Sequence, residues 1–177
     1  GSLARLQEII GEEEWIFHAA TQDLPCLREL ELDPTLIFDT ELAARLLGYE
    51  RVGLGAVIER LLGISLEKAH SAADWSTRPL PETWLAYAAL DVELLIDVRD
   101  QLHQELVDAG KLEAAREEFA DILERELGVK KPDAWRRIGG ISRLRSPRAL
   151  AVARELWLSR DEMARSSDTA PGRLFPD

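Results

Sequence analysis

Apolar residues recur at helical spacing along most of the chain, and two short apolar runs interrupt that pattern in its first third. The runs EWIFHAA and LIFDT have the length and the apolar, β-branched and aromatic content of strands. Helical spacing predicts helices in SLARLQEIIG, TQDLPCLREL, ELAARLLG and GLGAVIERLLG, three of them ending at a glycine. In TQDLPCLREL we expect Thr21 or Gln22 near the cap.

The second half of the chain is predicted to be helical almost throughout. The run PETWLAYAALDVELLIDVRDQLHQELVDAG predicts one long helix, with Pro81 in its first turn and Gly110 beyond its end. KLEAAREEFADILEREL follows as a charged amphipathic helix. A last helix is predicted from its cap, Ser146, to about Arg165, and the tail SSDTAPGRLFPD is expected to be irregular.

Two strands are too few for a self-sufficient sheet. Either the helices form the core alone, or part of the sheet lies outside this chain. The fold class that we predict is α/β and predominantly helical.

Charge divides the chain at the segment KKPD, the best linker candidate. Residues 132–177 hold nine arginines and six acidic residues, a net charge of +3, which leaves −14 for residues 1–131 out of a total of −11. Such asymmetry predicts two domains, 1–131 and 132–177. The acidic domain repels nucleic acid unless cations or a local basic patch intervene.

Composition excludes several classes of protein. A hydrophobic content of 46% supports an ordered core. Apolar runs fall short of the roughly 20 residues that a membrane span needs, so we expect no membrane partner. Cys26 is the single cysteine, which excludes an internal disulfide, suits a cytoplasmic location and predicts a small buried side chain.

The stretch YAALD places a phenol and a carboxylate on one face of the long helix. Tyr87 and Asp91 lie four residues apart, roughly 5–6 Å at their Cβ atoms. Asp is a poor helix former and is costly to bury alone. Asp91 is therefore either a functional carboxylate or a rim residue paired with an arginine, and Tyr87 is either functional or a core aromatic.

A second carboxylate follows the first predicted strand. Asp23 falls in the first turn of the next helix, at the edge of a sheet where α/β folds build their sites. The alternative is an acid that is stabilised by the helix dipole. His18, inside the strand, is more often structural, and Asp39 is expected to cap the helix after LIFDT.

Candidate nucleic-acid contacts lie in two segments. In DWSTRPLPETW, Trp75 either plugs the core or lines a nucleotide groove together with Arg78, with Lys68 and His70 adding phosphate contacts. The second segment is the arginine cluster at 136–148, which either binds nucleic acid or is a solvated surface. Its candidate residues are Arg136, Arg137, Arg143 and Arg145.

The segments HAATQDLPCL, IFDTELAARLLG, GLGAVIERLLGISLEK, DWSTRPL and YAALDVELL, in this order, resemble ribonuclease D. That family consists of 3′-5′ exonucleases of the DEDD superfamily, in the subgroup marked by a tyrosine. The resemblance covers residues 12–127. Residues 133–177 resemble the start of an HRDC domain, the helical module that follows the nuclease. The resemblance thus implies a partial ribonuclease H-like exonuclease fold followed by a partial HRDC domain.

The resemblance also implies a mechanism and a substrate. Four carboxylates would hold two Mg²⁺ or Mn²⁺ ions, with Asp23 and Asp91 as two of these ligands and Tyr87 orienting the attacking water. Two such ions, roughly 3.5–4 Å apart, can activate water and stabilise the leaving oxygen. The implied substrates are RNA 3′ ends, including tRNA precursors.

One departure from the family pattern stands out, because no Asp-x-Glu precedes Asp23. We therefore expect an internal fragment that is inactive by itself and self-associates through an unpaired strand edge. Two alternatives stay open: a non-catalytic nucleic-acid-binding or scaffold module, and a DNA exonuclease of the same superfamily.

Overall fold

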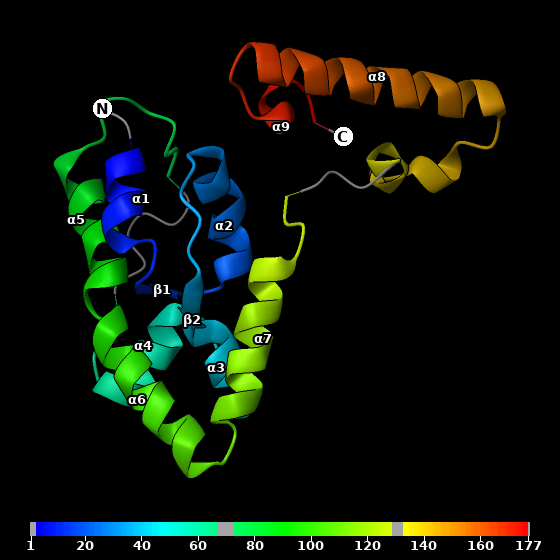
Figure 1. Ribbon diagram of the computed structural model, residues 1–177. Coiled ribbons are helices and arrows are strands. Elements are labelled where there is room, and N and C mark those ends of the chain that lie inside the picture. The colour runs from blue at the N-terminus through cyan, green and yellow to red at the C-terminus, as the bar shows by residue number, and fades with distance from the viewer. Residues whose placement is uncertain (1–2, 67–72, 129–132, 177) are drawn as a thin grey trace. The chain divides into compact units, whose positions relative to one another are not determined.

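The computed structural model describes residues 3–66, 73–128 and 133–176 (Figure 1). The chain divides into two compact units, Gly1–Leu127 (unit 1) and Gly128–Asp177 (unit 2). The predicted linker KKPD lies mostly outside the described residues, as do Ser2, Lys68 and His70.

Unit 1 is built on two parallel strands. β1 (Glu14–Phe17) pairs with β2 (Leu36–Asp39), and Phe17 lies opposite Asp39 at the carboxyl end of both strands. The connection between them contains α2 (Ala20–Glu29) and is long enough for the crossover that parallel strands require. The expected strand EWIFHAA is too long, because Ala19 adopts a left-handed conformation (φ 67°) and α2 begins at the next residue.

Helices surround this strand pair on the described part of unit 1 (Figure 1). Besides α2, these helices are α1 (Ala4–Ile10), α3 (Thr40–Leu46), α4 (Leu54–Leu62), α5 (Glu82–Glu93), α6 (Leu95–Asp108) and α7 (Leu112–Glu124).

The core of unit 1 lies where α3, α4, α6 and α7 meet the strands. One face of α6 is buried through Leu95, Val98, Leu102 and Leu106, a spacing of three and four residues. From α7, Phe119 packs against Phe38 of β2 with ring centroids 5.0 Å apart. Hydrophobic burial therefore packs α6 against β1 and α7 against β2.

The single long helix predicted from Pro81 to Gly110 is wrong, because the chain breaks at Leu94 into α5 and α6. Neither proline nor glycine marks the break. The two helices differ in their surroundings: α6 buries a complete stripe, whereas α5 buries no residue. Their packing, and not a local sequence signal, accounts for the break.

The described residues of unit 2 form two 3₁₀ helices and two α-helices. They are η1 (Ala134–Arg137), η2 (Ile141–Arg143), α8 (Pro147–Ser166) and α9 (Pro171–Leu174). Ser146 caps α8 as expected, since its hydroxyl accepts a hydrogen bond from the Ala149 backbone N–H at 3.1 Å. The tail is not wholly irregular, because Pro171 starts α9 within it.

Among the described residues, no helix combines the length and apolar character required to cross a bilayer.

Candidate functional site

The junction between β1 and α2 positions the first candidate carboxylate. β1 ends at Phe17, the chain turns through His18 and Ala19, and Asp23 stands in the first turn of α2 with its side chain exposed. The carboxyl ends of parallel strands are where open α/β folds place their sites. Asp23 therefore lies where the sequence analysis predicted.

His18 is held at this junction by Thr40, the first residue of α3. Its Nδ1 lies 2.9 Å from Thr40 Oγ1, and that hydroxyl donates to the Phe17 carbonyl at 2.9 Å. Because the hydroxyl has only one hydrogen, Thr40 must accept from His18 Nδ1–H. The neutral imidazole is thus fixed in the tautomer whose Nε2 carries a lone pair.

Asp23 and Asp91 interact electrostatically with the same imidazole. Burial raises the pKa of Asp23, the nearby Asp39 raises it further, and His18 opposes both. Burial likewise raises the pKa of Asp91, again against His18. Burial lowers the pKa of His18, although Asp39, Glu41 and Asp23 act in the other direction. Two carboxylates far apart in the sequence thus each interact electrostatically with His18.

Tyr87 and Asp91 lie one turn apart on α5, and both are half-buried. Trp75, from the preceding loop, packs beside them: its ring lies 5.4 Å from that of Trp84 and 6.4 Å from that of Tyr87. The loop is thereby anchored on the helix that carries the second carboxylate.

The donor chemistry fits part of a divalent-cation site. Carboxylate oxygens are the ligands that Mg²⁺ prefers. No ion pair of Asp23 or Asp91 is recorded in the described parts of the chain. Within those same parts, however, no group of three or more His, Cys, Asp or Glu residues could hold a metal ion. Asp23 and Asp91 thus have the right donor type and are too few to form a complete site.

A separate cavity of about 360 Å³ lies between β2, α6 and α7. Its carboxylate, Glu14, is paired with Arg99 at 2.7 Å. Neither Asp23 nor Asp91 lines it, so this cavity does not belong to the candidate site.

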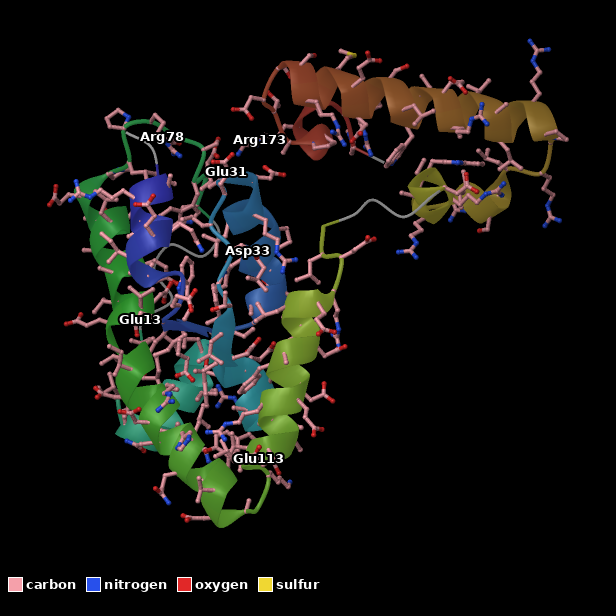
Figure 2. The ribbon with its side chains drawn as sticks, in the orientation of Figure 1. Glu13, Glu31, Asp33, Arg78, Glu113 and Arg173 are labelled. Carbon is pink, nitrogen blue, oxygen red and sulfur yellow. The ribbon has the colours of Figure 1, made fainter. Side chains whose placement is uncertain are left out.

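The other residues predicted to contact nucleic acid lie in two separate segments of the chain. Arg78 is exposed on the loop before α5, where its Nη1 donates to the carbonyls of Trp75 and Thr77, both at 2.8 Å (Figure 2). In unit 2 the four predicted arginines are exposed, and Arg136 stands over the ring of Trp135 at 4.6 Å. Exposed acidic residues of unit 1 labelled in Figure 2 are Glu13, Glu31, Asp33 and Glu113.

Two residues of the site have interactions beyond those that the sequence predicted. Asp39 caps α3 as expected, but its carboxylate also accepts from Ala19 and Ala20 at the start of α2. His18, expected to be structural, also interacts electrostatically with both candidate carboxylates. The available signal was the recurrence of polar residues at both strand ends. Cys26 was expected to be buried and is exposed.

Comparison with known families places this arrangement in context. The model of a 3′-5′ exonuclease family matches residues 2–107. The ribonuclease D of Nitrobacter hamburgensis is 34% identical over 165 residues, which cover 92% of this chain and 43% of that protein. The chain therefore spans less than half the length of this relative.

Solved structures show the same similarity. A protein from Bifidobacterium adolescentis is 47% identical with a TM-score of 0.92, over 99% of this chain and 43% of that one. Escherichia coli RNase D, an exoribonuclease involved in structured RNA processing, is 30% identical with a TM-score of 0.74, over 99% and 48%. Brucella melitensis NrnC with bound Mg²⁺ is 27% identical with a TM-score of 0.61, over 68% and 60%.

Proposed function

This chain belongs to the 3′-5′ exonuclease family, and on that premise we propose that it forms part of a ribonuclease D-type enzyme that removes nucleotides from RNA 3′ ends. The proposal is supported by the position of Asp23 at the carboxyl end of β1 and of Asp91 one turn from Tyr87 on α5. Each carboxylate interacts electrostatically with His18, and no ion pair is recorded for either in the described residues. Since the chain spans 43% of a ribonuclease D relative, the remaining ligands would come from the rest of the protein.

In this proposal Asp23 and Asp91 hold divalent cations, Mg²⁺ or Mn²⁺, through their carboxylate oxygens. Bound cations would supply Lewis-acid stabilisation of the phosphodiester as it is cleaved. The Tyr87 hydroxyl, one helical turn from Asp91, orients the attacking water. The Mg²⁺-bound neighbour NrnC supports the choice of metal. Cation binding also relieves the unfavourable burial of both carboxylates.

RNA is the proposed substrate because similar proteins are ribonucleases. Within that class, tRNA precursors are the substrates that we favour. Trp75 and Arg78, on the loop before α5, are proposed to contact the nucleotide strand beside Tyr87. Lys68, also proposed for phosphate contact, lies outside the described residues. A cytoplasmic location is part of the proposal, because the exposed free thiol of Cys26 suits a reducing compartment.

Residues 1–177 alone are proposed to be inactive. Two carboxylates cannot satisfy two hard cations that each prefer about six oxygen ligands, even when water supplies several of them. Addition of Mg²⁺ or Mn²⁺ to this piece should leave RNA intact, whereas the full-length protein should trim it.

The test is RNA trimming by full-length variants. Asp23→Asn and Asp91→Asn should each lower the rate by more than about 100-fold, the upper end of the loss caused by removing an outer-shell partner of a metal site. Matched controls are Glu29→Gln on α2 and Glu93→Gln on α5, both exposed, which should leave the rate within about twofold. Tyr87→Phe should lower the rate while keeping the ring contact with Trp75.

The substrate is a 5′-labelled RNA, which shows shortening from the 3′ end as a ladder. A parallel DNA substrate of the same sequence distinguishes an RNA exonuclease from a DNA exonuclease. Normal trimming by Asp91→Asn would refute the assignment of the site.

A second candidate function, nucleic-acid binding without catalysis, is favoured by one observation in unit 2. Arg137, Arg143 and Arg145 are exposed, and no ion pair is recorded for them among the described residues. If they bind phosphates, Arg143→Ala should weaken RNA binding equally for all sequences and reduce the salt slope by about one. Binding without trimming by the full-length protein would favour this second function.

A further inference from the structure

A single buried carboxylate joins the starts of two helices in unit 1. Asp39 is 3% exposed, and its oxygens accept four backbone hydrogen bonds. Two come from the start of α2, from Ala19 N–H at 3.1 Å and Ala20 N–H at 2.8 Å. The other two come from α3, from Glu41 N–H at 2.9 Å and Leu42 N–H at 3.1 Å. Asp39 therefore caps two helices at once.

The conformation of the β1–α2 junction needs such a restraint. Ala19 has φ 67° and ψ 56°, a left-handed conformation that residues with a Cβ rarely adopt. No side chain of α2 itself caps its N-terminus. The Asp39 carboxylate satisfies the N–H groups of Ala19 and Ala20 and thus holds the chain in this turn.

Thr40 secures the other side of the same junction. Its hydroxyl donates to the Phe17 carbonyl and accepts from His18 Nδ1–H, both at 2.9 Å, and its side chain is fully buried. Asp39 and Thr40 together hold every residue from Phe17 to Ala20, three residues before Asp23.

We propose that Asp39 and Thr40 act as a positioning clamp that sets the direction in which α2 leaves β1, and thereby places the Asp23 carboxylate against Asp91 for cation binding. Neither residue is proposed as a ligand: the Asp39 carboxylate accepts four backbone hydrogen bonds, and the Thr40 hydroxyl is engaged by Phe17 and His18. The clamp acts through the backbone, and it rests on the proposed role of Asp23 as a ligand.

The two oxygens of Asp39 accept different hydrogen bonds, so a substitution that alters only one oxygen can test the clamp. Oδ1 accepts from Ala19, Glu41 and Leu42, whereas Oδ2 accepts only from Ala20. In Asp39→Asn, the amide oxygen can take the place of Oδ1 and keep the α3 cap. The amide nitrogen then faces Ala20 N–H, and a donor cannot accept. This substitution should free the start of α2 while α3 stays capped.

The first measurement is amide hydrogen exchange in the metal-free full-length protein. Asp39→Asn should remove protection at Ala20 and leave it at Leu42. The second is Mn²⁺ affinity by calorimetry, which should fall about 10- to 100-fold, as for other outer-shell partners of metal ligands. Thr40→Val should weaken Mn²⁺ binding in the same direction, and Thr40→Ser, which keeps the hydroxyl, should restore it.

Unchanged Mn²⁺ affinity in Asp39→Asn, with protection lost at Ala20, would overturn the clamp. If Asp39→Asn loses protection at Leu42 as well, the two Thr40 variants provide the test. Equal Mn²⁺ affinity in Thr40→Val and Thr40→Ser would then overturn the clamp. Asp23→Asn is measured in parallel. If Asp23→Asn binds Mn²⁺ normally, the failure lies in the proposed metal site, whereas normal binding by Asp39→Asn alone is a failure of the clamp.

Discussion

Asp91 is an unusual residue for its position. It is a half-buried carboxylate in the last turn of α5, burial raises its pKa, and no ion pair is recorded for it in the described residues. A carboxylate in this state costs folding free energy when it ionises. Such a cost is typical of residues kept for function and not for stability.

This cost predicts that Asp91→Asn stabilises the metal-free protein. The folded state binds the Asp91 proton more tightly than the unfolded chain, so stability falls as pH rises from the ordinary pKa of 3.8 through the raised value. At neutral pH the melting temperature of Asp91→Asn should exceed that of the wild type by about 1–2 °C, since 1 kcal/mol corresponds to about 2–4 °C in a protein of this size and solvent screening reduces the effect.

The measurement is thermal unfolding between pH 3 and pH 8 in the presence of a chelator. The difference between the two proteins should vanish below the ordinary pKa of Asp91. Asp97→Asn, in the first turn of α6, is the matched control and should not raise the melting temperature. A lower melting temperature for Asp91→Asn at neutral pH would show that its carboxylate stabilises the fold.

Residue types and spacing predicted some local roles and missed others. Capping by Asp39 and Ser146 followed from their positions before apolar helical runs and is confirmed. The second duty of Asp39 could not be read from the sequence, because its partners Ala19 and Ala20 are backbone groups brought close by strand pairing. Cys26 was misjudged because it occupies the exposed side of α2.

At the scale of elements, the helix break at Leu94 decides how the site is assembled. Two residues separate Asp91 from Leu94, and beyond Leu94 α6 packs into the core. The pattern of apolar residues continues through the break, so periodicity alone joined the two helices. The second strand and the helices α3, α4, α7 and α8 were predicted nearly to their bounds, whereas the first strand was predicted three residues too long.

The loop before α5 should depend on Trp75 for its place. Trp75→Ala removes two aromatic contacts, to Trp84 and Tyr87, which are worth roughly 0.5–1.5 kcal/mol each beyond burial. We therefore expect a loss of about 1–3 kcal/mol in the free energy of unfolding, measured by urea denaturation.

Trp75→Phe keeps a ring at this position and should recover most of that loss. If Trp75→Ala instead weakens RNA binding and leaves stability unchanged, Trp75 contacts nucleotides and does not anchor the loop.

At the scale of the whole chain, the sheet is small. β1 and β2 form a two-stranded sheet in the described residues, so each strand has an edge without a strand partner there. Exposed large apolar side chains also gather on α1 and α5: Leu3, Leu6, Ile9, Leu85, Leu90 and Val92. The count of predicted strands left two possibilities open, a core formed by the helices alone or a sheet that continues outside this chain, and it could not indicate which strand edges are unpaired.

Residues 1–177 should therefore self-associate in isolation. Unpaired strand edges and apolar patches favour pairing between chains. Sedimentation velocity between about 5 and 200 µM should show a weight-average mass that rises above the 19.9 kDa of one chain. A constant monomer mass over this range would contradict the expectation.

The central claim, that Asp23 and Asp91 jointly hold a divalent cation, is tested most directly by Mn²⁺ calorimetry of the full-length protein as a double-mutant cycle. Asp23→Asn and Asp91→Asn should each weaken Mn²⁺ binding, and the double variant should lose far less than the sum of the two losses, because both act on one site. Strictly additive effects, or unchanged Mn²⁺ affinity in either single variant, would contradict the account.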